Sequence, residues 1–371
     1  MKLLMITGLG SARDLASGKK GAFYNTLEEF SKYWDRIDII APKNTKHKTQ
    51  TIILFGNVYV HVSPWPLVFH PLWFIKKASS LHKENKFDLI TVHDFPPFYN
   101  GIGARLLWQK IKVPYILEIF HIPGYPRSAS FKESVYKLLF KFFIRFDAKY
   151  ARAVRVMSKS QTPEFLKKFG VPENKIQYIP AIYLDLETFR PLNLSKEYDL
   201  IFVGRLEPNK GTNLLIDSAR ILKNQTLNFK MLVVGDGPLK NNLRLKIENL
   251  KLQNNVLLYG WAKDSKEIAE LINKAKVLVL PSYNEGGPRV IFEAMACGVP
   301  VLATPVGMVP DLQSSVTLID WDPGHIADKI KKILSDANMY NDQRSQGLEV
   351  VKHFEKKAAI ENYANKLKKL L

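Results

Sequence analysis

Short apolar segments alternate with amphipathic segments along the 371-residue chain. The apolar segments predict two series of β-strands. The first series comprises residues 2–7, 36–41, 52–55, 88–92, 115–119 and 154–158, and the second comprises 199–203, 230–234, 256–259, 277–280 and 299–303. Helical periodicity between strands, for example at 214–222, 239–250 and 290–297, predicts crossover helices and therefore parallel sheets with helices on both faces.

Two such series predict an α/β protein with two Rossmann-like domains, in agreement with a usual domain size of about 150 residues. The join falls in residues 182–196, where no periodicity is sustained. We place a first domain at residues 1–190 and a second at 191–351. Ligands of doubly wound sheets bind at the carboxyl ends of the strands, so the expected site is a cleft between the domains.

The charge of the chain is strongly basic and uneven. There are 54 Lys and Arg against 35 Asp and Glu, a net charge of +19, of which residues 1–190 carry +14. Such an excess favours phosphorylated ligands, an anionic membrane surface or nucleic acid, and charge does not choose among them. The single cysteine excludes an internal disulfide, and no run approaches the ~18 apolar residues of a membrane span. The first residues read as a strand rather than a signal peptide, so we expect a cytoplasmic protein.

The first stretch with candidate chemistry is V-G-R-L-E-P-N-K-G at 203–211. Gly204 lets the backbone approach a ligand, and a helix begins near Gly211, where free amides favour an anion. Arg205 and Lys210 are two cations suited to a diphosphate. A solvated loop between strand and helix is the open alternative.

A second loop, G-D-G-P at 235–238, also lies between a strand and a helix. Gly235 and Gly237 are similar to a nucleotide-binding turn, but the full G-x-G-x-x-G spacing is absent.

The third stretch is P-S-Y-N-E-G-G-P-R-V-I-F-E-A-M-A-C-G-V-P at 281–300. Glu285 follows an apolar strand, and the amides of Arg289 and Val290 at the next helix start are suited to a phosphate. Glu293 lies on an apolar helix, where a carboxylate needs a polar partner such as ribose hydroxyls. An ion pair at the helix edge is the alternative interpretation of Glu293.

Jointly, these stretches resemble the retaining GT-B glycosyltransferases of glycosyltransferase family 4. The E-x7-E run and the G-R…K-G and G-D-G-P blocks occur in the family's order, after A-V-R-V-M-S at 153–158 and G-V-P at 170–172. The resemblance covers nearly the whole chain. It implies the GT-B fold, in which two Rossmann-like domains face each other across a cleft and the last helix, here residues 352–371, packs back on the first domain.

The resemblance also implies roles for residues of the second domain. Arg205 and Lys210 would bind the donor diphosphate, and Glu285 would face the donor sugar. The remaining donor-binding positions are Gly204, Gly235, Gly237, Trp261, Gly286, Gly287, Arg289, Val290 and Glu293, the last of which would hold the ribose.

In the first domain, the resemblance implies a catalytic role for His121, which follows an apolar strand. His93 and Asp94, after another strand, are a second choice. A loop histidine bonded to backbone is the alternative interpretation of His121.

The family further implies a metal-independent hexosyltransferase without a cofactor. Fixed cations and helix amides can stabilise a diphosphate leaving group, and the sequence has no metal-ligand spacing. The expected partners are a nucleotide sugar and a glycan or lipid-linked acceptor, in the biosynthesis of cell-envelope polysaccharide or glycolipid. A nucleotide-sugar epimerase with the same architecture is the alternative. A nucleic-acid-binding protein is suggested by charge alone, and no recognition module is present.

Residues 131–155 combine apolar side chains near a three-four spacing with seven Lys and Arg against two acidic residues. One interpretation is a basic amphipathic helix that lies on anionic lipid, so that the protein is peripheral to the membrane. The other is a core helix with a solvated basic face.

Overall fold

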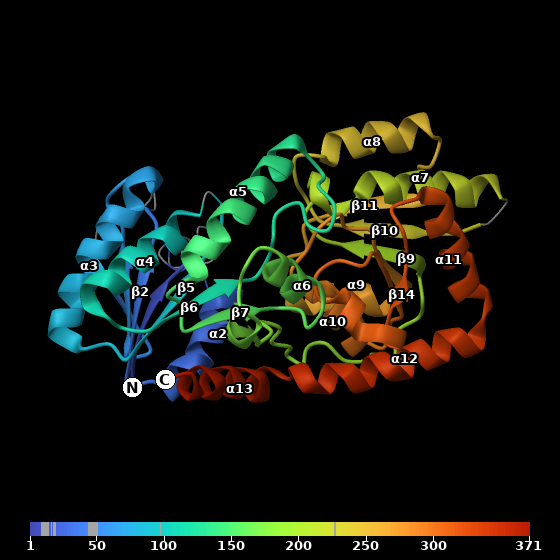
Figure 1. Cartoon of the computed structure of the whole chain (residues 1–371). Helices are drawn as coiled ribbons and strands as arrows, with labels where there is room; N and C mark the ends of the chain where they lie inside the picture. Colours follow the sequence, from blue (N-terminus) through green and yellow to red (C-terminus); the bar gives the residue numbers. More distant parts are fainter. Residues whose placement is uncertain (9–14, 16, 18–19, 44–50, 97, 226–227) are drawn as a thin grey trace. The chain divides into compact units, whose positions relative to one another are not determined.

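The chain forms two compact units (Figure 1). The computed structural model describes residues 1–8, 15, 17, 20–43, 51–96, 98–225 and 228–371. The first unit consists of Met1–Ile122, Val135–Tyr183 and Lys357–Leu371, and the second of Pro123–Ser134 and Leu184–Lys356. The chain therefore leaves the first unit twice and returns to it twice.

The first unit is built on an eight-stranded sheet with the order β3-β4-β2-β1-β5-β6-β7-β8. All neighbouring strands are parallel except β3 and β4, which pair antiparallel. The strands are β1 (Lys2–Ile6), β2 (Arg36–Ala41), β3 (Ile52–Leu54), β4 (Val58–Val62), β5 (Leu89–His93), β6 (Tyr115–Ile119), β7 (Ala153–Val156) and β8 (Ile176–Tyr178). The central strands are buried on both faces, which explains their nearly continuous apolar sequences.

Helices cover both faces of this sheet. They are α2 (Ala22–Phe30), α3 (His70–Asn85), α4 (Tyr99–Ile111), α5 (Phe131–Ala148), α6 (Gln161–Lys168) and α13 (Lys356–Lys369), with short 3₁₀ turns η1 (Ser31–Tyr33), η2 (Leu67–Phe69) and η3 (Glu173–Lys175). Helix α13 buries Ile360 and Leu367 in the same core as Leu3. Its Tyr363 stacks on Phe30, with ring centroids 4.8 Å apart.

The second unit is a six-stranded parallel sheet with the order β11-β10-β9-β12-β13-β14. In chain order this is 3-2-1-4-5-6, the Rossmann arrangement, whose order reverses between β9 and β12. The strands are β9 (Tyr198–Val203), β10 (Met231–Val234), β11 (Val256–Gly260), β12 (Ala275–Leu280), β13 (Val301–Ala303) and β14 (Thr317–Leu318).

The helices of the second unit are α7 (Thr212–Asn224), α8 (Lys240–Asn249), α9 (Ser265–Asn273), α10 (Arg289–Ala296), α11 (Pro323–Ser335) and α12 (Ala337–Val351), with 3₁₀ turns η4 (Pro208–Lys210), η5 (Val309–Ser315) and η6 (Lys352–Phe354). Figure 1 shows α7 and α8 on one face of the sheet and α9 and α10 on the other.

The predicted α/β class and all eleven predicted strands are confirmed, with end shifts of one or two residues. The prediction omitted β4, β8 and β14. Strand β4 has the sequence V-Y-V-H-V, in which His61 interrupts the apolar run, yet His61 is buried because its Nε2 lies 2.7 Å from Asp38 Oδ1.

The predicted basic helix at 131–155 is too long. Helix α5 ends at Ala148, and Arg155 belongs to strand β7. Arg155 is buried, and its Nη1 donates to Glu118 Oε1 at 2.6 Å. This arginine therefore contributes to the core of the first unit and not to a basic surface.

Candidate functional site

The candidate site lies where the strand order of the second sheet reverses. The loops that follow β9 and β12 meet there, since Tyr283 N donates to Asn209 O at 2.7 Å. Crevices at such switch points bind the ligands of doubly wound folds.

Lys210 and Glu285 form the central ion pair of the site, between Nζ of the lysine and Oε1 of the glutamate. Lys210 ends η4, and Glu285 lies in the loop after β12. Ser282 Oγ donates to the same carboxylate oxygen at 3.2 Å. Both charged side chains are largely buried, so their attraction is screened less than that of a surface pair.

Hydrogen bonds to backbone carbonyls hold the loop that carries Glu285. The carbonyl of Ser282 accepts hydrogen bonds from Thr304 Oγ1 at 2.5 Å and from Trp321 Nε1 at 2.9 Å. Further along, Met308 N donates to Gly286 O at 3.0 Å. These hydrogen bonds fix the backbone on both sides of Glu285.

Two glycines permit the close contacts between these loops. Gly211 has φ +67°, and a Cβ there would lie 1.9 Å from Pro281 O. Gly235 has φ +143°, and a Cβ there would lie 1.9 Å from Gly204 O. Only glycine satisfies both the positive φ and the contact. The structure thus brings the predicted glycines Gly204 and Gly235 together.

Helix α10 begins directly after the Glu285 loop, with Pro288 at its N-cap. The first backbone hydrogen bond of this helix runs from Ile291 N to Pro288 O. The amides of Arg289 and Val290 lie before this bond, at the start of the helix. On the same helix, Glu293 Oε1 lies 2.8 Å from Arg289 Nε. Burial raises the pKa of Glu293 above its usual value, although the Arg289 guanidinium opposes this shift. The ion pair that the sequence analysis left as an alternative interpretation is present.

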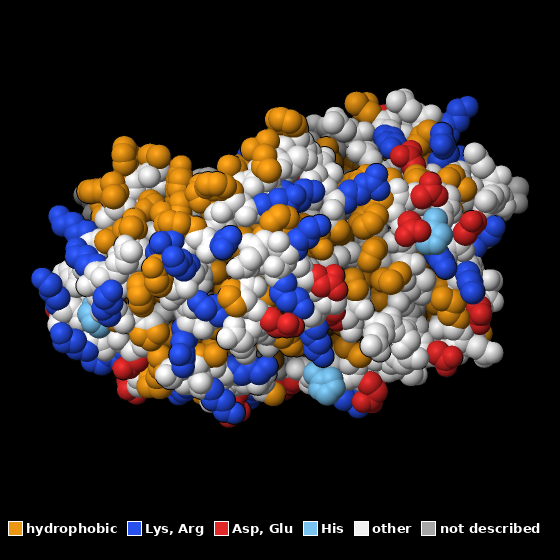
Figure 2. Space-filling view, viewed as in Figure 1, with side chains coloured by type: hydrophobic (Ala, Val, Ile, Leu, Met, Phe, Trp, Pro, Cys, Tyr) orange, Lys and Arg blue, Asp and Glu red, His pale blue; other side chains and the backbone are white. Residues whose placement is uncertain are grey.

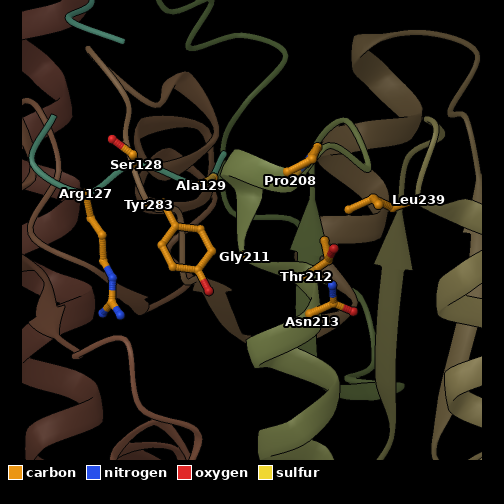
Figure 3. Close-up of a pocket in the computed structure, with 9 residues that line it drawn as sticks. All are labelled: Arg127, Ser128, Ala129, Pro208, Gly211, Thr212, Asn213, Leu239 and Tyr283. Carbon is orange, nitrogen blue, oxygen red and sulfur yellow. The ribbon is translucent and has the colours of Figure 1, made fainter. Parts of the chain in front are cut away.

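A pocket of about 460 Å³ adjoins this region (Figure 3). Arg127 and Tyr283 line one side, and Pro208 and Leu239 line the other. Thr212, at the start of α7, also lines it. The Thr212 hydroxyl is buried and has no hydrogen-bond partner among the described residues.

Arg127 reaches the pocket because Pro123–Ser134 belongs to the second unit. Asn284 holds this segment, since its Nδ2 donates to Arg127 O at 3.0 Å and to Glu133 Oε2 at 2.8 Å. The Arg127 guanidinium lies 5.7 Å from the centroid of the Tyr283 ring and 5.6 Å from that of Trp321. The guanidinium of this exposed side chain thus lies within cation–π distance of two aromatic rings.

The other predicted residues of the second unit occupy the edges of the region. Arg205 is 65% exposed, and its Nη1 lies 3.1 Å from Glu207 Oε1. Gly237 lies against the backbone of Leu206, whose carbonyl would be 2.6 Å from an added Cβ. Trp261 is 67% exposed beyond the end of β11. Gly287 lies between the Glu285 loop and α10.

The two histidines proposed for catalysis belong to the first unit. His121 is exposed after β6. His93 has a pKa lowered to about 4, chiefly by burial, so its ring is neutral. Asp94 serves helix α4 instead, since its Oδ1 accepts a hydrogen bond from Gly101 N at 3.0 Å.

Sequence reasoning missed Arg127, Asn284 and Thr212. Asn284 lies directly before Glu285 in the 281–300 stretch, and this position could have indicated that it belongs to the site. Nothing in the local sequence around Arg127 indicates that this segment joins the second unit. In the part of the chain that the structure describes, no group of three His, Cys, Asp or Glu is arranged to hold a metal ion.

Comparison with known proteins gives two family matches that together span most of the chain. The family described as "Glycosyl transferases group 1" matches residues 186–350, and the one described as "Glycosyltransferase Family 4" matches residues 23–181. The boundary between the matches falls close to the change of unit at Tyr183–Leu184.

Individual proteins are similar over most of the chain. An uncharacterised glycosyltransferase of Methanocaldococcus jannaschii is 28% identical over 301 residues, which cover 76% of this chain and 71% of the relative. The UDP-Gal:alpha-D-GlcNAc-diphosphoundecaprenol alpha-1,3-galactosyltransferase of Escherichia coli is 29% identical over 248 residues, 62% of each chain. Among solved structures, sucrose-phosphate synthase from Thermosynechococcus elongatus has a TM-score of 0.80 at 20% identity, covering 100% of this chain and 99% of that one.

Proposed function

Since the chain belongs to glycosyltransferase family 4 and has the GT-B fold, we propose that it is a retaining hexosyltransferase that takes a sugar from a nucleotide sugar. The second unit binds the donor. The acceptor is a glycan or a lipid-linked sugar of the cell envelope, at the cytoplasmic face of a membrane.

The observation that carries this proposal is the Lys210–Glu285 ion pair at the switch point of the second sheet. When the bond between sugar and nucleotide breaks, negative charge develops on the diphosphate. Lys210 and the amides at the start of α10 are fixed donors that stabilise such charge without reorganisation. Glu285, hydrogen-bonded by Ser282, is the carboxylate that faces the sugar.

Arg205 completes the diphosphate site in this proposal. Its guanidinium is exposed and paired with Glu207 on one side only, so it is available to a phosphate oxygen. For His121, which follows β6 in the first unit, we propose a catalytic role. These protein cations provide the charge that a metal provides in other transferases, so we propose a metal-independent reaction with no cofactor.

Glu293 binds the ribose in this proposal. Its carboxylate is buried beside Arg289, and two ribose hydroxyls are good donors to a buried carboxylate. Gly204, Gly235, Gly237 and Trp261 flank the base. The name of the Escherichia coli relative includes UDP-Gal and a diphosphoundecaprenol acceptor. This supports a uridine nucleotide as the first donor to test and a lipid-linked acceptor.

Calorimetric titration with UDP, GDP, ADP and their common sugar conjugates tests the donor site. We expect one nucleotide to bind, and Glu293→Ala to weaken it by tenfold or more, about the value of a lost charge-assisted hydrogen-bond pair. Glu248→Ala, at an exposed position of α8, is the matched control and should bind normally. Absence of binding by all nucleotides to folded protein would refute the proposal. Product analysis with the bound donor then separates sugar transfer from epimerisation.

A further inference from the structure

Helix α5 has two apolar faces. Its buried face contains Phe140, Ile144 and Ala148. On the opposite side, the α5 stripe consists of Val135, Leu138, Phe142 and Phe146, all exposed, with Leu138 at 66% and Phe142 at 77%. A helix turns by about 100° per residue, so these four positions fall within about 80° of one another. Core packing explains the first face and does not explain the stripe.

A second exposed apolar group precedes and begins helix α3. This α3 group consists of Trp65, Val68, Phe69 and Leu72, the last being 60% exposed. Helix α4 connects the two groups, since it packs against α3 and its Arg105 Nη1 donates to Phe146 O of α5 at 3.2 Å. Figure 2 shows hydrophobic side chains gathered over the start of α3 and along α5. Monomeric soluble proteins rarely expose so many large apolar side chains together.

Cations accompany both groups. Lys141 and Arg145 follow the α5 stripe along one side, and Lys76 lies one turn after Leu72 on α3. The only two acidic residues of α5 are turned elsewhere: Glu133 accepts hydrogen bonds from Asn284 and Ala129, and Asp147 is buried. The exposed apolar face of α5 is therefore bordered by positive charge without acidic residues.

We propose that the α5 stripe and the α3 group form a docking surface for a bilayer that contains anionic lipid. Apolar side chains enter the interface between headgroups and acyl chains, and the flanking cations attract anionic headgroups. Among the described residues, no helix has both the length and the apolar character needed to span a bilayer, so this contact is lateral. The inference extends the proposed function, because it places the first unit against the surface that would carry a lipid-linked acceptor.

Vesicle flotation with the full chain tests this surface. Wild type should float with phosphatidylcholine vesicles that contain phosphatidylglycerol, less with phosphatidylcholine alone, and less at high salt. Phe142→Ser and Phe69→Ser should each weaken the partition by tenfold or more, since each removes a large side chain from the interface. Leu245→Ser is the matched control: Leu245 is 57% exposed on α8 of the second unit, and its removal should change nothing.

Three other outcomes would contradict the proposed docking surface. If wild type does not float, or if Leu245→Ser weakens flotation as much as Phe142→Ser, the proposal is wrong. If light scattering shows a dimer that Phe142→Ser dissociates while flotation is unchanged, the stripe binds a second copy instead. Nucleotide titration of the same variants keeps the two proposals apart, because the donor site is in the second unit. If a variant loses flotation but still binds the nucleotide, the result bears only on the docking surface. If the protein does not bind any nucleotide, the result bears only on the proposed function.

Discussion

Lys210 and Glu285 are 75 positions apart in the sequence, yet they form an ion pair because each follows a strand at the point where the order of the second sheet reverses. The pair neutralises Lys210 in the absence of ligand. A donor diphosphate that attracts Lys210 would release the Glu285 carboxylate toward the sugar. In the proposed function, this ion pair would link donor binding to the readiness of the carboxylate.

Glu285→Gln should reduce kcat by about a hundredfold or more while changing nucleotide affinity by less than about threefold. The amide keeps the size of the side chain and removes the charge that, in the proposed function, would face the sugar in the transition state. Turnover assays and calorimetry on the same preparation measure the two effects. Glu207→Gln, which removes the partner of Arg205, is the comparison and should change kcat little. Equal losses of turnover and affinity in Glu285→Gln would contradict the sugar-facing role.

Gly235→Ala should destabilise the second unit by roughly 2 to 4 kcal/mol, because the new Cβ meets Gly204 O and the positive φ is strained. Gly260→Ala separates these causes, since Gly260 has φ +93° and nothing within 4 Å of an added Cβ. It should cost only about 1 to 2 kcal/mol. Urea unfolding followed by circular dichroism compares the variants, and similar losses in both would show that the contact with Gly204 is unimportant.

Substitution by valine should have different effects on the free energy of unfolding at two buried threonines of the second unit. Thr304→Val removes a hydroxyl that donates to Ser282 O, and it should reduce the free energy of unfolding by about 1 kcal/mol. Thr212→Val removes a hydroxyl without a partner among the described residues, so stability should stay the same or increase. Denaturant unfolding measures both. A marked loss in Thr212→Val would mean that its hydroxyl is bonded in solution.

The buried carboxyl groups of Asp94 and Asp147 give the first unit a pH-dependent stability. Burial raises the pKa of Asp147 to about 9, with a further contribution from Asp94, and burial raises the pKa of Asp94 to about 7. Both values lie above that of an unfolded aspartate, so the folded state holds protons that the unfolded state releases. Their contribution to stability should therefore be fully present below the pKa of an unfolded aspartate, about 3.9, and should be lost as the pH rises toward about 7 for Asp94 and about 9 for Asp147, by up to about 1.4 kcal/mol per pH unit for each group.

Asp147→Asn should reduce this pH dependence and raise the melting temperature at pH 8, because asparagine stays neutral at every pH in this range. Asp328→Asn, at an exposed position of α11, is the control and should leave the profile unchanged. Melting curves from pH 4 to pH 9 test the expectation. A profile in Asp147→Asn that coincides with wild type would show that Asp147 is not protonated in the folded state.

The sequence was sufficient to predict eleven strands, because parallel sheets buried on both faces leave continuous apolar runs, as in Tyr115–Ile119. It was also sufficient to indicate which loops of the second unit meet, since Gly204, Gly235 and Glu285 all follow such runs. It failed where a polar residue is satisfied by a distant partner. His61 interrupts β4 but pairs with Asp38, and Arg155 was assigned to a basic face although Glu118 pairs with it inside the core.

The site residues that could not be predicted from the sequence are positioned by contacts between distant segments of the chain. Arg127 lies in the second unit because Asn284, 157 positions later, holds its carbonyl. No local sequence pattern encodes such a contact between distant segments. The double face of α5 was hidden for another reason. Periodicity shows that apolar residues recur along a helix, but it does not show which of two apolar faces packs against the core.

The packing of α13 on Phe30 also has a consequence for biosynthesis. A ribosome releases residues of the first sheet early, but the core that they form includes Ile360, Tyr363 and Leu367, which emerge only after the entire second unit. Until then, the apolar side chains of β1 and α2 lack part of their covering. We therefore expect the core of the first unit to be completed only when α13 has been synthesised, after the second unit.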